Sequence, residues 1–156
     1  MLDVAQLRNL IIKPALQALN LFTPEAMELL VFTCANESDG GHFVHQLNGP
    51  ALGIYQMEPN TYNDIWQNYI NSRQDLKLQL LHNFNAPVMP DEDRMIYDLR
   101  FASAMCRIHY ARVPKAIPEL YDVDGLWNYY KTYYNSSAGK ADYHQALEKY
   151  NAFRDN

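Results

Sequence analysis

Apolar residues recur at helical spacing along most of the chain. From Asp3 to Leu21 they fall three or four positions apart, and Pro14 is expected to bend or divide this helix. A second helix is predicted to begin at Thr23, because the run Thr23–Glu25 combines a hydroxyl N-cap, a proline at the first helical position and an acid near the positive end of the helix dipole. Its apolar series continues to Glu37 and Ser38, where Asp39–Gly41 ends it.

The pattern changes between Gly40 and Met57. This segment has no helical period, and it contains the glycines at 40, 41, 49 and 53 together with Pro50. Its alternating apolar patches are too short for a large sheet. We therefore expect a loop or small hairpin that lines a cleft.

Helical periodicity resumes after this segment. It is weak from Asp75 to Phe84 and strongest from Asp91 to Val113, where residues including Cys106 and His109 share one face and the pattern predicts the central helix. Three more helices are expected, at Thr61–Ile70, Val123–Tyr134 and Ala141–Phe153, with a turn over Asn135–Gly139 before the last. No repeat or linker interrupts this order, so residues 1–156 are predicted to form one mainly α-helical domain.

Composition and charge narrow the class of protein. The chain is 48% hydrophobic and 20% charged, and no apolar run approaches the roughly 20 residues of a membrane helix, so no membrane span is expected. Its net charge is −5 with scattered Lys and Arg, which argues against nucleic-acid binding. The N-terminus lacks the basic-then-apolar order of a signal peptide. Cys34 and Cys106 lie in apolar helical patterns and are expected to be buried thiols, although a disulfide between them stays open.

Glu37 is the candidate catalytic acid. A carboxyl group that acts as a general acid must hold its proton near neutral pH, and partial burial beside apolar groups achieves this. Glu37 ends an apolar helix and faces the glycine-rich segment, so one side can be desolvated while the other meets a substrate. This position alone does not distinguish it from a solvated glutamate at a helix end.

Three short motifs in fixed order supply the context for Glu37. The pair Glu37-Ser38 is followed by Gly53–Thr61 (GIYQMEPNT) and later by Tyr134–Lys140 (YNSSAGK). In this order the chain resembles the soluble lytic transglycosylases and their goose-type lysozyme relatives. Their landmarks are a Glu-Ser pair, a Gly-Leu-Met-Gln-like segment before Pro-x-Thr, and a Tyr-Asn-x-Gly-like segment. Here Ile-Tyr replaces Leu-Met, Glu58 precedes the proline and the last turn is longer, which bears on subsite preference more than on reaction class.

The resemblance implies a lysozyme-like fold and assigns roles to individual residues. Glu37 would be the acid/base that cleaves the β-1,4 bond between N-acetylmuramic acid and N-acetylglucosamine in peptidoglycan, and Ser38 would help to fix its carboxyl. Tyr134 would approach Glu37 and hold its orientation, while Asn135 would stabilise the turn or touch a sugar. The remaining expected contacts with the glycan are Tyr55, Gln56 and Met57.

Aromatic side chains are a further source of sugar contacts. Tyrosine is abundant, and planar rings can stack on sugar faces. Most aromatic residues at helical spacing belong to a core, so only two or three of the candidates are expected in the cleft. The candidates are Tyr55, Tyr62, Trp66, Trp127 and Tyr129.

The type of reaction depends on a second carboxylate. A hydrolase normally places one at roughly 5 to 5.5 Å as nucleophile, or at 6.5 to 9.5 Å as base. Asp39 is too near in sequence to share a helix face with Glu37, and Glu58 or Asp64 would serve only if the loop folds back. With one acid, the C6 hydroxyl of the muramic acid attacks C1 and leaves a 1,6-anhydro end, which is the transglycosylase outcome. A hydrolytic lysozyme using Asp64 or Glu58 is the alternative, and an inactive glycan-binding or structural virion component is another.

A metal-dependent hydrolase using His42 and His45 is the weakest alternative. The pair lies in an irregular loop without a clear third ligand, so no metal and no cofactor are expected. The stretches Arg100–Tyr110 and Tyr130–Asn135 resemble compact members encoded by tailed bacteriophages. This resemblance implies a monomer that acts on peptidoglycan strands, with virion proteins as partners and a location in the host cytoplasm or the virion before delivery to the cell wall.

Overall fold

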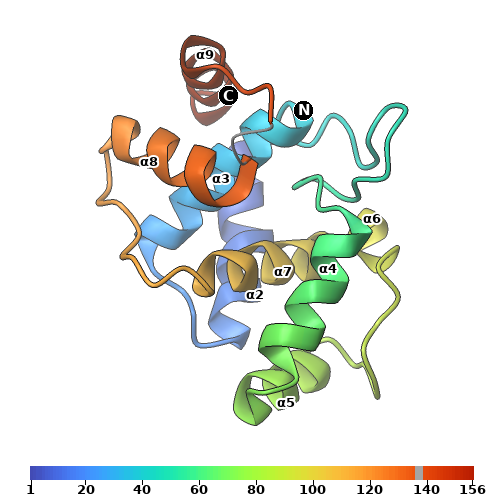
Figure 1. Ribbon diagram of the computed structural model, residues 1–156. Coiled ribbons are helices and arrows are strands. Elements are labelled where there is room, and N and C mark those ends of the chain that lie inside the picture. The colour runs from blue at the N-terminus through green and yellow to red at the C-terminus, as the bar shows by residue number, and fades with distance from the viewer. Residues whose placement is uncertain (136–138) are drawn as a thin grey trace.

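The computed structural model describes residues 1–135 and 139–156 (Figure 1). The chain is mainly helical, as the sequence predicts. Within the described residues the extended pairings are two isolated antiparallel bridges, between His45 and Leu52 and between Leu52 and Met57. They confirm a loop with minimal hairpin character between the second and third predicted helices. Ser136–Ala138, in the predicted turn, lie outside the described residues.

The N-terminal helical stretch runs without a gap through α1 (Val4–Gln6), the π-helical η1 (Leu7–Ile12) and α2 (Lys13–Ala18). Of the two effects expected of Pro14, bending or dividing the helix, division is therefore excluded. The proline ring crowds the carbonyl four residues earlier, and a wider turn relieves that crowding. The released carbonyl of Leu10 accepts a hydrogen bond from Nε of Arg100 at 3.2 Å.

Helix α3 (Pro24–Ser38) begins and ends where the sequence predicts. The hydroxyl of Thr23 accepts a hydrogen bond from the Ala26 amide at 3.0 Å, which satisfies one of the free N–H groups of the first turn. Asp39, Gly40 and Gly41 all adopt positive φ angles, of 50°, 67° and 78°. This left-handed run ends the helix and turns the chain into the loop.

The predicted helix over 91–113 is two helices, α6 (Arg94–Tyr97) and α7 (Leu99–Ala111). Asp98 separates them with an extended backbone, φ −112° and ψ 93°. Its side chain accepts a hydrogen bond from the Phe101 amide at 3.0 Å, so it caps α7 instead of continuing α6. Apolar periodicity spans both helices and conceals this break.

The other predicted helices are present with small changes in their ends. The segment near Thr61 forms α4 (Pro59–Ile65) and the π-helical η2 (Trp66–Ile70), and α5 covers Gln74–Asn83. Near the C-terminus, α8 (Val123–Tyr130) continues directly into the π-helical η3 (Lys131–Asn135), and α9 covers Tyr143–Arg154. Helix α9 begins two residues later than predicted because Asp142 caps it.

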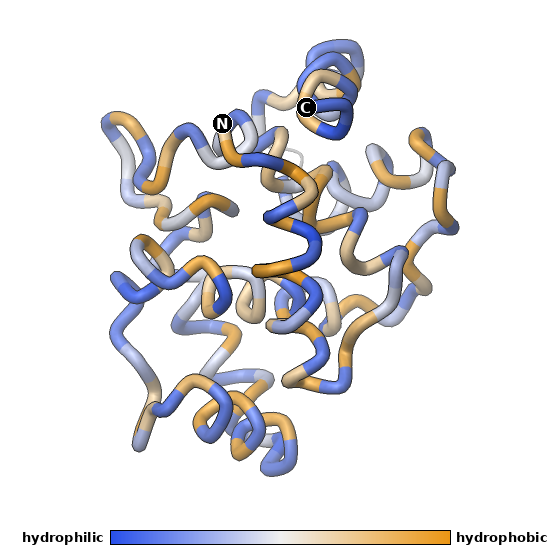
Figure 2. The backbone as a smooth tube through the Cα atoms, turned by 180° about the vertical axis from the view of Figure 1, so that it is seen from behind, coloured by the Kyte–Doolittle hydropathy of each residue, from blue (hydrophilic) through white to orange (hydrophobic). Residues whose placement is uncertain are grey.

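Helices α3 and α7 form the middle of the molecule (Figure 1). Helix α3 packs against η1, α7, α8 and α9, while α7 packs against α2, η1, α3, α4, α6 and η3, which confirms its central place. Apolar residues are spread through all parts of the tube in Figure 2, and those that are buried form one core. Asn156 donates a hydrogen bond to the Leu2 carbonyl at 3.3 Å, so the two termini meet.

The two cysteines lie inside this core. Both are free and buried, which confirms the expected thiols and excludes a bond between them in this structure. Burial raises the pKa of the Cys34 thiol to about 12 and that of Cys106 well above its usual value.

None of the helices in the described residues has the length and apolar character needed to cross a membrane.

Candidate active site

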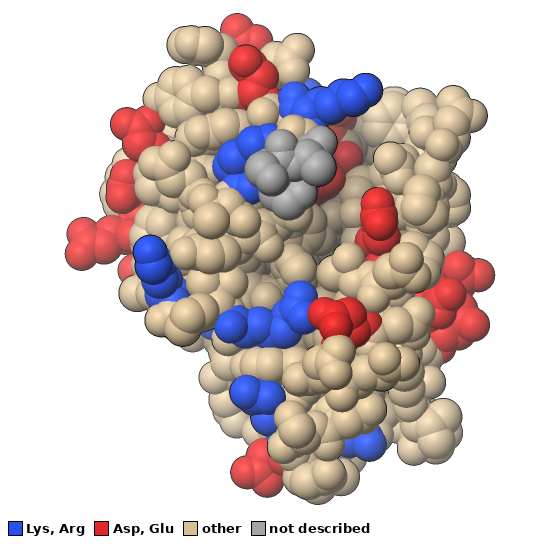
Figure 3. All heavy atoms as spheres, viewed as in Figure 1, with Lys and Arg blue, Asp and Glu red and all other residues tan. Residues whose placement is uncertain are grey.

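A cleft of about 610 Å³ opens between the loop after α3 and the end of η3. Figure 3 shows the hollowed face, on which Lys and Arg are interspersed with Asp and Glu. The side chain of Glu37 reaches this cleft from the last turn of α3. The lining residues from the loop and the start of α4 are Gln46, Ala51, Gln56, Met57, Glu58 and Thr61, and those from the other wall are His109, Tyr133, Tyr134, Asn135 and Gly139.

Glu37 is a partly buried acid under two opposing influences. The hydroxyl of Tyr130 donates a hydrogen bond to its Oε1 at 2.7 Å. Burial raises the pKa of the Glu37 carboxyl, and this effect exceeds the lowering by Tyr130, Asn135 and the positive charge of Lys149. The carboxyl thus holds its proton to a higher pH than an ordinary glutamate does, which suits a proton donor.

The tyrosine that holds Glu37 is Tyr130 and not Tyr134, which corrects the expected role of Tyr134. The two rings lie one helical turn apart and stack with centroids 6.3 Å apart. The hydroxyl of Tyr134 instead donates to the backbone carbonyl of Tyr55 at 2.7 Å, while its ring lines the cleft. The two tyrosines are four residues apart and therefore lie on one face of α8 and η3. This spacing is the feature of the sequence that could have indicated Tyr130.

Ser38 and Tyr55 are buried and do not line the cleft. Ser38 has no exposed surface, and its hydroxyl donates to the Ile54 carbonyl at 2.6 Å and accepts from the Gly41 amide at 2.9 Å. It therefore ties the end of α3 to the loop instead of fixing the Glu37 carboxyl. Tyr55 is 1% exposed and its hydroxyl pairs with that of Ser103 at 2.9 Å. The role expected of Ser38 beside the carboxyl and the glycan contact expected of Tyr55 are both corrected to structural roles.

Gln56, Met57 and Asn135 lie in the cleft, as the motifs predict. Gln56 has a positive φ of 48°, and its side-chain amide donates to the Gly53 carbonyl at 2.8 Å. The side-chain oxygen of Asn135 accepts from Nζ of Lys131 at 2.9 Å. The loop and η3 thus bring these three residues to the same cavity as Glu37.

The other candidate acids occupy different positions. Glu58 lines the cleft, whereas Asp64 lies outside the described lining and forms an ion pair with Arg112 at 2.8 Å. Asp39 pairs with Lys149 at 2.7 Å. Across the described residues no group of three or more His, Cys, Asp or Glu side chains is arranged to hold a metal ion.

The expected stacking residues are also absent from the described lining. Tyr62 and Trp66 are completely buried, and helical spacing places them with the core. Tyr129 is buried as well, and its hydroxyl donates to the Lys115 carbonyl at 2.9 Å. The aromatic rings in the described lining belong to Tyr133, Tyr134 and His109.

His109 is a cleft residue that the sequence did not predict. Its Nε2 lies 3.1 Å from the Tyr133 carbonyl, and its Nδ1 lies 2.8 Å from Nη2 of Arg112. Burial, and then the nearby Arg112 charge, lower the pKa of His109 to about 4. The sequence places it on the apolar face of the central helix, and nothing in the local pattern marks it as the residue where that face meets the cleft.

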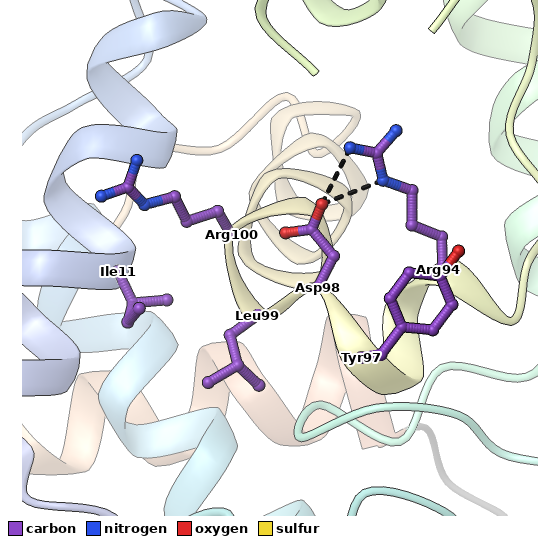
Figure 4. A pocket seen from close by; sticks show the side chains of 6 residues that line it. All are labelled: Ile11, Arg94, Tyr97, Asp98, Leu99 and Arg100. Atoms are coloured by element: carbon purple, nitrogen blue, oxygen red, sulfur yellow. Dashed lines mark hydrogen bonds and ion pairs between the residues drawn. The ribbon is translucent and has the colours of Figure 1, made fainter. Parts of the chain in front are cut away.

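A second hollow of about 520 Å³ lies between η1 and the corner formed by α6 and α7 (Figure 4). Its Arg94 and Asp98 pair with each other at 2.9 Å. None of the motif residues lines it.

Comparison with protein-family models, with curated proteins and with solved structures found no match. The cleft around Glu37 is therefore the candidate active site on its own geometry and on the order of the motifs.

Proposed function

We propose that the protein is a peptidoglycan lytic transglycosylase with a lysozyme-like fold and Glu37 as acid/base. The observation that carries this proposal is the Glu37 carboxyl, which is partly buried, hydrogen-bonded by Tyr130 and open to a cleft of about 610 Å³. A mainly helical fold with a loop forming one wall of the cleft is compatible with this assignment. The substrate is the β-1,4 bond between N-acetylmuramic acid and N-acetylglucosamine.

In the first step the protonated Glu37 donates its proton to the bridging oxygen as the bond from C1 to that oxygen breaks. The leaving sugar departs with a free hydroxyl, and Glu37 becomes a carboxylate. The Tyr130 hydroxyl and the Asn135 amide favour this charged state, since both lower the pKa of Glu37. In the second step the carboxylate takes the proton of the muramic acid C6 hydroxyl while O6 bonds to C1, giving a 1,6-anhydro end without water.

The polar lining of the cleft fits a glycan. Gln46, Gln56 and Asn135 carry amides that can donate to and accept from sugar hydroxyl and N-acetyl groups. The ring of Tyr133 or Tyr134 offers an apolar face of the kind on which a sugar packs. In the setting implied by the resemblance, such an enzyme would act on the cell wall during phage entry or host lysis.

A hydrolytic lysozyme is the second candidate, and one observation favours it. Glu58 lies in the same cleft as Glu37 and is exposed to solvent, so it could activate a water molecule. Asp64, the other acid considered, faces Arg112 and lies outside the described lining. Glu58 is therefore the residue that separates the two reactions.

The test compares the wild type with Glu37→Gln and Glu58→Gln on purified peptidoglycan. We expect Glu37→Gln to lower the rate by about 100-fold or more, the scale of general acid catalysis, while its circular-dichroism spectrum stays unchanged. Glu58→Gln should retain most of the activity, and mass spectrometry should find released muropeptides one water lighter than hydrolytic products. Reducing-end products together with loss of activity in Glu58→Gln would establish the hydrolase. An unchanged rate in Glu37→Gln would overturn both.

A further inference from the structure

Most of the described wall of the cleft opposite the loop belongs to one short segment, η3. This segment contributes Tyr133, Tyr134 and Asn135 to the lining, and it directly follows Tyr130, which holds Glu37. Any displacement of η3 would therefore change the hydrogen bonds made to the Glu37 carboxyl. What fixes this segment against the rest of the molecule is thus relevant to the proposed chemistry.

A chain of three side chains joins η3 to α4 across the end of α7. Nη1 of Arg112 lies 2.8 Å from Oδ2 of Asp64, and Nη2 of the same guanidinium lies 2.8 Å from Nδ1 of His109. Nε2 of His109 then lies 3.1 Å from the Tyr133 carbonyl. The His109 ring also packs edge-on against Tyr134, with centroids 4.8 Å apart at 88°.

Donor and acceptor types leave only one arrangement for these contacts. A guanidinium has no acceptor, so Arg112 donates and Nδ1 of His109 accepts without a proton. A carbonyl oxygen has no donor, so Nε2 of His109 carries the proton and donates to Tyr133. Arg112 therefore fixes His109 as the neutral Nε2–H tautomer, the form that keeps both bonds.

The Tyr133 carbonyl lies in the last turn of η3, where side chains or water commonly satisfy backbone carbonyl groups. The structure supplies His109, whose position on α7 is fixed by the core packing of that helix. The segment is thereby anchored at Tyr133, between Tyr130 and Asn135.

We propose that His109 is a positioning residue, which Arg112 and Asp64 lock in one tautomer so that η3 keeps Tyr130 and Asn135 in place beside Glu37. The proposal deepens the proposed function and rests on it for its catalytic consequence. The hydrogen bonds from Arg112 to His109 and from His109 to the Tyr133 carbonyl carry most of this positioning. The ion pair between Arg112 and Asp64 contributes little, because Asp64 is exposed to solvent.

The test measures the Glu37 carboxyl directly by carbon-13 NMR titration, together with activity per folded molecule. We expect His109→Leu to raise the pKa of Glu37 further, because hydrogen bonds that favour the carboxylate are weakened, and to lower the rate about 10- to 100-fold through misplacement. His109→Gln keeps an N–H at the position of Nε2 and should bring the pKa of Glu37 and the rate much of the way back to the wild-type values. Arg112→Met should change this pKa and the rate in the same direction as His109→Leu does, and Asp64→Asn should change them least.

The matched control is Arg94→Met, which breaks an Arg–Asp pair of similar length away from the cleft. It should leave the pKa of Glu37 unchanged. Nitrogen-15 NMR of the wild-type imidazole should show the Nε2–H tautomer at pH 6. The opposite tautomer, or an unchanged Glu37 titration in both His109→Leu and Arg112→Met, would overturn the proposal. If His109→Leu fails to fold, His109→Gln and Arg112→Met decide. An inactive wild type with the expected titrations would refute the proposed function while leaving the positioning role intact.

Discussion

At the scale of single residues, the proposed reaction requires Glu37 to act first as an acid and then as a base. Burial at the end of α3 favours the neutral carboxyl, while Tyr130, Asn135 and Lys149 favour the carboxylate. A group that donates a proton and then accepts one needs both states within reach at the working pH. Removing the Tyr130 hydroxyl deletes one oxygen atom and with it one hydrogen bond to Glu37. It is therefore a small change that tests this balance.

Tyr130→Phe should raise the pKa of Glu37, because it removes a hydrogen bond that favours the charged form. The alkaline limb of the activity profile, where the acid loses its proton, should move to higher pH. The free energy of unfolding should fall by about 1 kcal/mol. Activity measured against pH and urea unfolding check these outcomes.

Tyr129→Phe is the control for this substitution. It removes a hydroxyl that donates to the Lys115 carbonyl at 2.9 Å, and it does not touch Glu37. Its cost in stability should be similar, with no change in the pH profile. A profile that moves equally in both variants would contradict the role given to Tyr130.

The sequence leads to Glu37, Gln56, Met57 and Asn135 because their motifs follow one another in a recognisable order. It does not separate Tyr130 from Tyr134, since the choice depends on how α8 widens into η3. It also assigns Tyr55 to the cleft, although its hydroxyl pairs with Ser103, 48 residues away, in the core. Contacts between distant segments decide such cases, and a local pattern does not contain them.

At the scale of elements, the loop wall of the cleft depends on close approach between two backbones. Gly53 has φ +73°, and a Cβ at this position would collide with the carbonyl oxygen of Met95 at α6. The Gly53 amide donates to the Val44 carbonyl at 2.8 Å, and its carbonyl accepts from the Gln56 side chain. Gly53 therefore lets the loop approach α6 closely, and its carbonyl holds the side chain of Gln56.

Gly53→Ala should destabilise the protein by about 2 to 4 kcal/mol, because it combines a left-handed backbone with a collision against main chain. It should also lower activity per folded molecule, as Gln56 and Met57 move. Gly49→Ala is the control in the same loop. There the added Cβ meets the far end of the Gln46 side chain, which can rotate at the cost of the hydrogen bond that its Oε1 accepts from the Ala51 amide. Because Gln46 also lines the cleft, this control is compared on stability alone, where its loss should be the smaller one. Equal losses in the two variants, measured by urea unfolding, would refute this account.

Most helices could be predicted from the sequence because their apolar spacing is local, while their caps set the exact first residue. Thr23, Asp122 and Asp142 each accept a hydrogen bond from a backbone amide three residues later, and each begins a helix. Asp98 does the same, yet it lies inside a continuous apolar period, so one helix is predicted where two form. Periodicity identifies the buried face and does not show whether the backbone continues along it.

At the scale of the whole molecule, two groups in one cleft respond to pH in opposite ways. Glu37 has a raised pKa in the folded state, and His109 has a pKa lowered from 6.5 to about 4. Lys149 of α9 and the Tyr130 and Asn135 side chains face Glu37, while Arg112, Asp64 and the Tyr133 carbonyl face His109. Their opposition arises because burial disfavours the charged form of each group, which is the anion of Glu37 and the cation of His109.

The sign of each effect follows from proton binding. Folded Glu37 binds its proton more tightly than the unfolded chain does, so its contribution to stability is lost as pH rises from 4.5 through its folded pKa. Folded His109 binds its proton less tightly, so stability is lost as pH falls from 6.5 to about 4, by up to about 3 kcal/mol for the full shift.

Glu37→Gln and His109→Gln should therefore change the slope of stability against pH in opposite directions. The free energy of unfolding of Glu37→Gln relative to the wild type should increase as pH rises from about 4 to 8, because the buried charge is gone. That of His109→Gln relative to the wild type should increase as pH falls through the same range. Urea unfolding at a series of pH values measures both, and each variant serves as the control for the other. A constant loss of stability in His109→Gln at every pH would show that His109 contributes packing alone. Slopes of the same sign in the two variants would contradict the opposite effects of burial on the pKa values of Glu37 and His109.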